Sequence, residues 1–202
     1  MSLPVQNTSS LEASLKKYAE AFALQNHAAK VVMRGLSLVG VGLRPVLDHI
    51  AFRTLHLKQR EQEFLDLGYE KDVTAKVLLK KGHGMEVFRR GCAAAIILEH
   101  PHEKSGLDWI AAFGDREPYY LAVRVEDLDE AVFCLEKQGI GFLRPMAGHR
   151  DDHLRQVAAV PEMKNGKEYS HLVLVERHAG GPKKFTRPIF GFKLNPSPCP
   201  SP

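Results

Sequence analysis

Residues 47–54 read Leu-Asp-His-Ile-Ala-Phe-Arg-Thr, a short apolar stretch with polar side chains that a simple core strand does not need. Alternation along a strand places His49, Ala51 and Arg53 on one face and the intervening apolar residues on the other. A histidine and an arginine on one face of a buried strand indicate a polar interior. Taken alone, a satisfied histidine and a solvated edge arginine explain the stretch more simply. The recurrence of the pattern changes this interpretation.

The second occurrence starts 71 residues later, and each copy reads as a strand, a helix and three further strands. Only six extra residues are needed in the second copy before its last strand. Internal repeats dictate architecture, and two such copies fold into sheets that curl around a shared cleft. The matched positions are His49 with Tyr120, Ala51 with Ala122, Arg53 with Arg124 and Gly68 with Gly139 at an offset of 71, and Glu99 with Glu176 at an offset of 77.

We therefore predict an α+β fold in which two βαβββ modules form a paired curled-sheet barrel, with an N-terminal helical region packed on it. Apolar residues at helical spacing predict one helix from about residue 10 to residue 33. Residues 141–146 are predicted as a strand. The predicted segments are 1–45 (helical region), 46–99 (first module), 100–118 (linker), 119–177 (second module) and 178–202 (a tail with a disordered Pro/Ser-rich end).

Composition bounds the function classes. The 202 residues, 44% of them hydrophobic, can bury the core of one large or two small domains. The net charge of +4 comes from 28 basic and 24 acidic residues without a basic block, so nucleic-acid binding is not indicated. Neither a membrane span nor a signal sequence is apparent, and we expect a cytoplasmic protein. Three widely spaced cysteines fit reduced thiols better than a disulfide framework or a Cys-based zinc site.

On these residues the chain resembles the vicinal oxygen chelate superfamily, which includes glyoxalase I, extradiol dioxygenases, hydroxyphenylpyruvate dioxygenase and the bleomycin-resistance proteins. The resemblance covers roughly residues 46–177. In that superfamily the first and last strands of each module offer metal ligands, usually His and then Glu or His. The corresponding positions here are His49, Glu99, Tyr120 and Glu176. Tyr120 departs from the pattern because a second histidine is common at its position.

The stretch from His49 to Thr54 is more particularly similar to the 2-oxoadipate dioxygenase/decarboxylase (hydroxyglutarate synthase) branch and the related YecM-like proteins. In the former the histidine is an iron ligand and the arginine four residues later holds a substrate carboxylate. The resemblance therefore implies these roles for His49 and Arg53. This chain is shorter than the typical enzyme.

Imidazole and carboxylate donors with open positions suit Fe(II), Mn(II), Ni(II) or Zn(II), and we favour Fe(II). Arg53 shares a face with His49, and Arg124 shares one with Tyr120. Two guanidinium groups near a cleft favour an anionic ligand such as a 2-oxo acid, because arginine binds a carboxylate bidentately. An outward surface charge explains either arginine equally well.

Other histidines compete for the position that Tyr120 fills. His149 and His153 flank an acidic loop, and His171 opens the last strand but faces away from Glu176 in a regular strand. We rank His153 first as a substitute, because it can reach inward from the start of its strand to a metal or a substrate. For each of these histidines, an ordinary structural role is the simpler explanation. Glu99 and Glu176 are individually also compatible with surface positions at strand ends.

Two function classes remain. The first is a metal-dependent enzyme, led by a non-haem iron dioxygenase acting on a small 2-oxo acid, with a glyoxalase-type lyase as a variant. Its ligands are His49, Glu99 and Glu176, with Arg53 as the carboxylate anchor and Tyr120 as a catalytic group. The second is a metal-free protein that binds a small ligand, in which Tyr120 stacks on or hydrogen-bonds to the ligand. One chain that carries both modules can complete the cleft without a partner. A monomer or a homodimer is therefore compatible with either function class.

Overall fold

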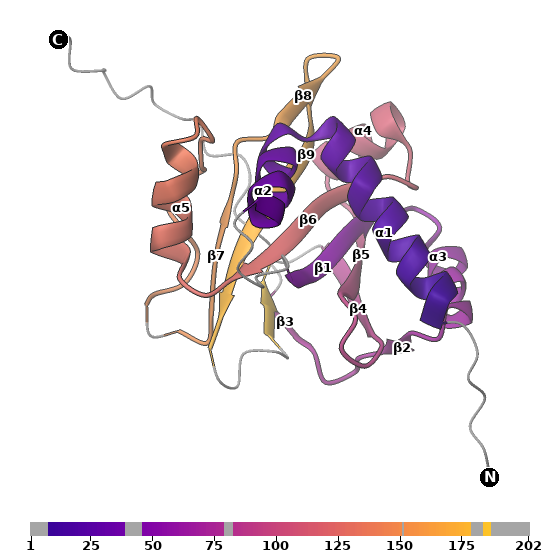
Figure 1. The fold of residues 1–202 in the computed structure, drawn as a ribbon. Coiled ribbons are helices and arrows are strands. Elements are labelled where there is room, and N and C mark those ends of the chain that lie inside the picture. Colours follow the sequence, from indigo (N-terminus) through magenta and orange to yellow (C-terminus); the bar gives the residue numbers. More distant parts are fainter. Residues whose placement is uncertain (1–7, 39–45, 79–82, 151, 179–183, 187–202) are drawn as a thin grey trace, which may run out of the picture.

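The computed structural model describes residues 8–38, 46–78, 83–150, 152–178 and 184–186 of the chain. Its centre is an 8-stranded sheet in which seven strands follow the order β2-β4-β5-β1-β6-β9-β7 and β8 pairs with β9. Strands β2 and β7 lie at opposite ends of this order, so the described sheet curls without closing (Figure 1). This arrangement confirms the predicted α+β fold with a curled sheet, and in the described residues the curl does not close.

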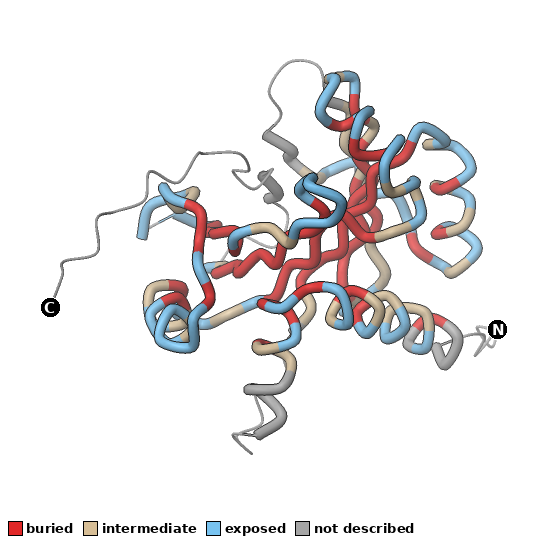
Figure 2. The backbone as a smooth tube through the Cα atoms, turned by 90° about the horizontal axis from the view of Figure 1, so that it is seen from above, coloured by how far each residue is buried: buried red, intermediate tan, exposed pale blue. Residues whose placement is uncertain are grey.

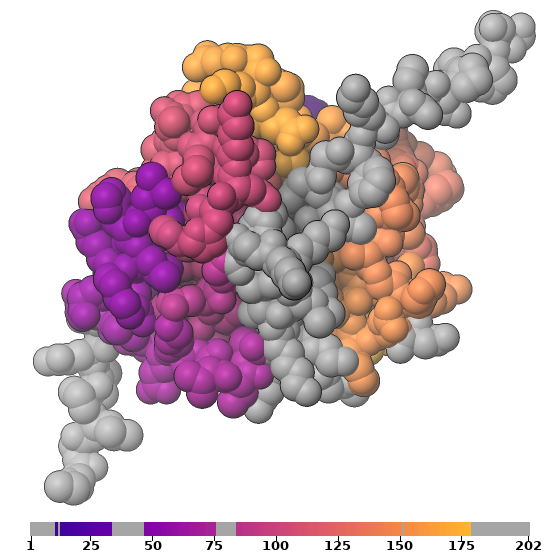
Figure 3. Space-filling model, turned by 180° about the vertical axis from the view of Figure 1, so that it is seen from behind, coloured from indigo at the N-terminus to yellow at the C-terminus, as the bar shows by residue number. Residues whose placement is uncertain are grey.

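The two modules meet at the middle of the sheet, where β1 and β6 pair antiparallel. Figure 3 shows the first module, in purple and magenta, and the second, in orange, on opposite sides of the molecule. The first comprises β1 (Val46–Arg53), α3 (Leu57–Asp66), β2 (Glu70–Lys71), β3 (Lys76–Leu78), β4 (His83–Arg89) and β5 (Ala95–Pro101). The second comprises β6 (Pro118–Val125), α5 (Leu128–Glu136), β7 (Leu154–Ala158), β8 (Glu162–Lys164) and β9 (Lys167–Arg177).

Local sequence signals explain the matching helices of the two modules. Gly68 lies two residues after the end of α3 and Gly139 three residues after the end of α5, with φ of +82° and +84°, a conformation that favours glycine. Asp127 caps α5 by accepting a hydrogen bond from the Glu130 N–H at 2.9 Å. The predicted pairing of the two glycines is therefore reflected in equivalent backbone geometry.

The N-terminal region forms two helices, α1 (Thr8–Gln25) and α2 (His27–Leu38), where one was predicted. The break lies at Asn26, whose Oδ1 accepts a hydrogen bond from the Ala29 N–H at 2.9 Å and caps α2. The Asn26 Nδ2 donates to the carbonyl and hydroxyl oxygens of Ser170 on β9. This tertiary contact made the single-helix prediction wrong, because helical spacing continues through the break.

The sheet has two differently covered faces. On the outer face, apolar residues of α1, α2 and α5 pack against Leu121, Val123, Leu172 and Leu174, and α3 packs against the outer face of the first module. The inner, concave face carries side chains of both modules, including Ala51, Tyr120 and Val173. Figure 2 shows the buried residues concentrated in the central strands, with exposed residues in the surrounding helices and loops.

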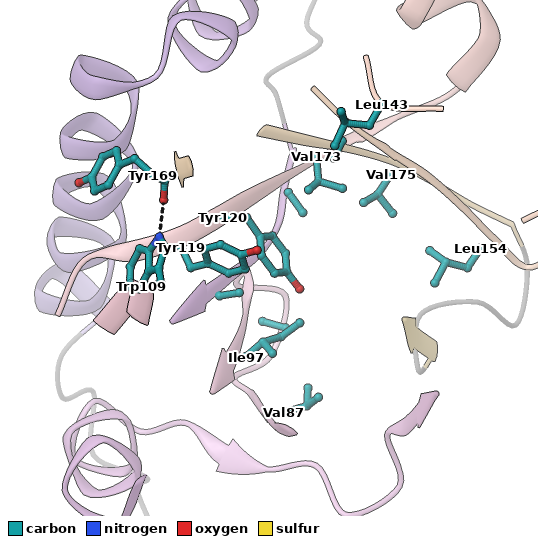
Figure 4. Close-up of a cluster of buried hydrophobic side chains, with 14 of the residues drawn as sticks. Val87, Ile97, Trp109, Tyr119, Tyr120, Leu143, Leu154, Tyr169, Val173 and Val175 are labelled. Carbon is teal, nitrogen blue, oxygen red and sulfur yellow. Dashed lines mark hydrogen bonds between the residues drawn. The ribbon is translucent and has the colours of Figure 1, made fainter. Parts of the chain in front are cut away.

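Side chains of both modules point toward one another across the concave interior (Figure 4). Val87 and Ile97 of the first module lie on one side, Leu154 and Val175 of the second on the other, and Tyr120 lies between them. Helix α4 (Lys104–Phe113), within the predicted linker, places Trp109 at one end of this interior, where its indole donates to the Tyr169 carbonyl at 2.8 Å.

Two further segments differ from the predicted elements. Within residues 141–146, Phe142 forms an isolated bridge with Ala159 in place of the predicted strand. In the tail, β10 (Lys184–Thr186) pairs parallel with β3, and the predicted disordered Pro/Ser-rich end lies outside the described residues. None of the described helices is long and apolar enough to cross a membrane.

Candidate functional site

A β-bulge in β1 shapes the candidate site. Leu47 pairs with Val123 and His49 pairs with Ala122, so Asp48 is an extra residue in the ladder. A bulge of this kind re-aims side chains and is common beside functional sites. It allows Asp48 to meet groups on the concave face, where His49 also lies.

A second bulge lies in β6. Ala51 pairs with Tyr120 and Phe52 pairs with Pro118, so Tyr119 is the extra residue there. Its side chain joins the concave cluster together with that of Tyr120, although simple alternation would separate the two.

The two bulges are related by the repeat, because Asp48 and Tyr119 are 71 residues apart. Each holds the arginine of the other module. Asp48 binds Arg124 through an ion pair of 2.9 Å, and Tyr119 carries the Arg53 guanidinium 3.3 Å from its ring centroid. Because of the repeat, each arginine lies beside the bulge residue of the other module.

Asp48 is the hub of the first of these clusters. Its carboxylate accepts hydrogen bonds from Arg177 at 2.7 and 2.8 Å, from Arg124 at 2.9 and 3.2 Å and from His49 Nδ1 at 2.7 Å. Burial acts to raise its pKa, but the hydrogen bonds and charges of His49 and Arg177 hold the pKa of Asp48 far below its usual range. Asp48 is therefore ionised at neutral pH and acts only as an acceptor.

His49 is neutral in this setting. Burial lowers its pKa, and the charges of Arg177 and Arg89 lower it further, against the opposing effect of Asp48. Because the Asp48 carboxylate only accepts, the Nδ1 of His49 carries the proton and Nε2 is the basic nitrogen. The His49 ring also meets Tyr120 edge-to-face at a centroid distance of 5.4 Å.

Three arginines of the described residues surround Asp48 and His49. Arg124 and Arg177 both pair with this one carboxylate, and the charge of Arg89 also reaches His49. The register of β4 on β5 places Arg89 opposite Ala95, and Ala95 pairs with His49 on β1. Only the small side chain of Ala95 therefore lies between Arg89 and His49. Arg89 is itself held by Asp72 at 2.6 Å.

A pocket of about 550 Å³ lies at the β2–β4 edge of the sheet. Arg89 lines the pocket, and the charge of the same arginine lowers the pKa of His49. The other lining residues are Gly68, Glu70, Lys71, Asp72, Val73, Thr74, Arg90 and Gly91.

The opposite end of the concave face is organised around Arg53. Its Nε donates to the buried Glu99 carboxylate at 3.2 Å, and Trp109 and Tyr119 flank its guanidinium. Burial lowers the pKa of His171 to about 3, and the charge of Arg53 contributes to this lowering. The predicted carboxylate anchor is thus already neutralised by Glu99 and enclosed by aromatic rings.

The strand registers change the equivalence of the two predicted glutamates. Ala95 pairs with His49, and His171 pairs with Tyr120, so the last strands of the modules are related by an offset of 76, from 95 to 171. Glu99 therefore corresponds to Val175. The predicted offset of 77 is wrong by one residue, and a one-residue shift turns a side chain to the opposite face.

Glu176 accordingly lies on the outer face beneath α5. Its Oε2 accepts hydrogen bonds from the Leu128 N–H at 2.8 Å and from Arg155 at 2.9 Å, and its Oε1 contacts His178. Arg155 also binds Asp129 on α5. These contacts anchor the start of α5 and do not direct Glu176 toward His49.

The described residues do not fit the expected metal site. His49 lies on the concave face, whereas Glu99 lies four residues farther along the paired strands, roughly 13 Å away. Glu176 is on the other face, and Tyr120 meets His49 through its ring. Within the part of the chain that the structure describes, no three His, Cys, Asp or Glu residues are grouped to hold a metal ion. His153 is exposed just before β7, where its carbonyl accepts a hydrogen bond from the His178 N–H.

Sequence reasoning missed three members of this site: Asp48, Arg177 and Arg89. Asp48 stands next to His49 in the sequence, and regular alternation would turn its side chain to the opposite face. The adjacency of an aspartate and a histidine was the available signal, since a carboxylate commonly orients an imidazole. Arg177 had no local signal, because only the register of β9 on β6 brings its side chain within reach of Asp48.

No protein-family model matches the sequence, and no curated protein matches it significantly. Solved structures do match its fold. A hydroxyglutarate synthase from Oryza sativa in complex with 2-oxoadipate superposes with a TM-score of 0.70 at 14% identity, over 87% of this chain and 83% of that chain. A putative hydrolase from Shewanella frigidimarina gives a TM-score of 0.65 at 13% identity, over 83% and 92%.

A mutant of 4-hydroxymandelate synthase from Streptomyces coelicolor gives a TM-score of 0.53 at 17% identity, and the match covers 70% of this chain and 52% of that one. The chain has the vicinal oxygen chelate fold. The structural neighbours therefore confirm the fold predicted from the repeat. At identities of 13–17% they establish the fold and not the activity.

Proposed function

We propose that this protein of the vicinal oxygen chelate fold binds a small carboxylate, of the 2-oxo acid or dicarboxylate class, beside His49 and without a divalent metal. The observation that carries the proposal is the convergence of Arg124 and Arg177 on the single carboxylate of Asp48. Arginine presents five N–H donors in a planar fork that matches a carboxylate. Guanidinium groups gathered at one end of the concave face are the groups that recognise a carboxylate ligand.

The two arginines have different parts in this proposal. Arg177 binds both oxygens of Asp48 and its side chain is only 3% exposed, so it is a fixed element of the site. Arg124 donates both of its bonds to one oxygen and its side chain is 44% exposed. Arg124 is therefore the group that a ligand arriving from solvent meets first.

The neighbouring structures supply the ligand class to test. The Oryza sativa hydroxyglutarate synthase of the same fold was solved with 2-oxoadipate, a dicarboxylate. The pocket at the β2–β4 edge shares Arg89 with the surroundings of His49.

A non-haem iron dioxygenase, the leading prediction from sequence, needs imidazole and carboxylate donors that converge on one ion. The described residues bring His49 alone of the three predicted ligands to the Asp48 cluster. Carboxylate binding through arginine needs no such convergence, which is why we favour it.

The experiment is calorimetric titration of the protein in EDTA with 2-oxoadipate, 2-oxoglutarate and adipate, with dimethyl adipate as the uncharged comparison. The dicarboxylates should bind and the diester should not. Arg124→Gln should weaken binding about 10- to 100-fold, because a hydrogen bond to a charged group contributes about 1.5–3 kcal/mol.

Arg144→Gln is the matched control. Arg144 is similarly exposed at 46% and pairs with Glu136 at the same 2.9 Å, but it lies outside the concave face. Equal losses in the two variants would show a non-specific charge effect and contradict the proposal. Binding that appears only after Fe(II) is added, and disappears in EDTA, would restore the iron-dependent function in its place.

A further inference from the structure

Two histidines lie side by side at the end of β5, outside the concave face. The ring centroids of His100 and His102 are 4.8 Å apart with an interplanar angle of 75°. His100 alternates with Glu99, so it belongs to the outer face, on the same side as Leu98. This pair is therefore separate from the Asp48 cluster.

The His100 ring is oriented by the backbone of Thr54. Its Nδ1 lies 3.0 Å from the Thr54 carbonyl oxygen, and a carbonyl only accepts, so Nδ1 is the donor. Nε2 consequently carries the lone pair of the neutral ring. A backbone carbonyl that fixes one ring nitrogen in this way is the arrangement that orients metal-binding histidines.

Thr54 is itself held rigidly. Its N–H donates to the Glu99 carbonyl at 2.9 Å, and its hydroxyl donates to Asp115 at 3.0 Å and accepts from the His56 N–H at 2.9 Å. Thr54 is fully buried. The carbonyl that positions His100 is therefore part of a preformed network.

Gly84 lies directly beside the two imidazoles. Gly84 on β4 pairs with His100, and a Cβ at Gly84 would lie 3.6 Å from the His100 Cβ and 4.0 Å from the His102 Nε2. The His102 ring thus folds back over β4 beside His100. Its position at the surface keeps it accessible to solvent.

We propose that His100 and His102 form an open surface site for a first-row transition-metal ion, bound by two imidazole nitrogens with water completing the coordination. Imidazole donors suit Cu(II), Ni(II) and Zn(II), whereas Mg(II) and Ca(II) prefer oxygen. Cu(II) binds most tightly by the Irving–Williams order. The site is independent of the carboxylate-binding function proposed above.

The experiment is titration of the full chain with Cu(II) in a weakly coordinating buffer, followed by calorimetry and electron paramagnetic resonance. The wild type should bind one equivalent with nitrogen hyperfine coupling from two imidazoles. His100→Ala and His102→Ala should each lower the affinity at least about tenfold, since even the loss of an orienting partner costs 10- to 100-fold.

Two further variants make the result specific. His153→Ala, at an exposed histidine elsewhere, should bind copper like the wild type. Gly84→Val should fill the space beside His102 and weaken binding while both histidines remain. Wild-type affinity in either histidine variant, or an equal loss in His153→Ala, would overturn the proposal, as would a wild-type protein that binds no copper. Circular dichroism checks that each variant is folded.

Discussion

Arg53 and Arg124 occupy equivalent positions in the two modules, yet their surroundings differ. Each is presented to the bulge residue of the other module, which is Tyr119 for Arg53 and Asp48 for Arg124. Arg53 gains its counter-charge from Glu99, and its side chain is 6% exposed. The position equivalent to Glu99 is Val175, so Arg124 has only its bulge partner among the described ion pairs, and it remains partly exposed.

The difference teaches that a repeat preserves backbone geometry more faithfully than side-chain chemistry. The two bulges and the two helix-ending glycines are matched, because they depend on strand pairing and local conformation. The partners of the arginines come from other strands and differ between the modules. One end of the concave face is consequently closed around the Arg53–Glu99 pair, whereas at the other end Arg124 and Arg177 share the Asp48 carboxylate.

The largest expected effect comes from replacing each of the two arginines in turn. Arg53→Met leaves the Glu99 carboxylate buried without its guanidinium partner, and should lower the free energy of unfolding by about 3–5 kcal/mol. Arg124→Met should cost within about 1 kcal/mol, because Asp48 keeps Arg177 and His49 and Arg124 is partly solvated. Urea denaturation measures both, and equal losses would contradict the distinction between a closed and an open end.

A second test uses His171 and Ala95, which occupy equivalent positions in the last strands. Burial holds the pKa of His171 at about 3 in the folded protein, below its usual value of 6.5. Below pH 6.5 this histidine becomes protonated in the unfolded chain but stays neutral in the folded protein. The contribution of His171 to stability is therefore complete above pH 6.5 and is lost as the pH falls toward 3.

His171→Ala introduces the residue of the first module and should remove this slope. Between pH 6.5 and 5 the wild type should lose about 2 kcal/mol more stability than the variant, at about 1.4 kcal/mol for each pH unit. The slope is the readout, because the cavity left by the substitution lowers stability at every pH. Parallel pH profiles for the two proteins would show that His171 does not remain neutral in the fold.

The smallest effect concerns the matched glycines. Alanine at Gly68 or Gly139 should cost about 1–2 kcal/mol, because both have positive φ. Gly139→Ala meets open space, whereas a Cβ at Gly68 would lie 3.3 Å from the Arg90 guanidinium. Thermal denaturation should therefore show a slightly larger loss for Gly68→Ala. A larger loss of stability for Gly139→Ala would mean that the Arg90 side chain moves aside without lowering the free energy of unfolding.

Much of the fold could be predicted from the sequence, and less of the site. Alternation identified the concave face of β1 with His49 and Arg53, and the offset of 71 located the same strand in the second module. Asp48 was missed because a bulge breaks alternation, and a bulge exists only in the pairing of two strands. Asn26 likewise ended a helix through a contact with Ser170 that helical spacing does not reveal.

The sequence by itself determined the α+β architecture, because side-chain periodicity and the repeat are written along the chain and act locally. The tertiary structure decided which side chains meet. It moved Glu176 to the outer face through a one-residue difference in register, and it brought Arg177 to Asp48 from a strand more than a hundred residues away. Register depends on the pairing of whole strands, and a shift of one residue reverses every face.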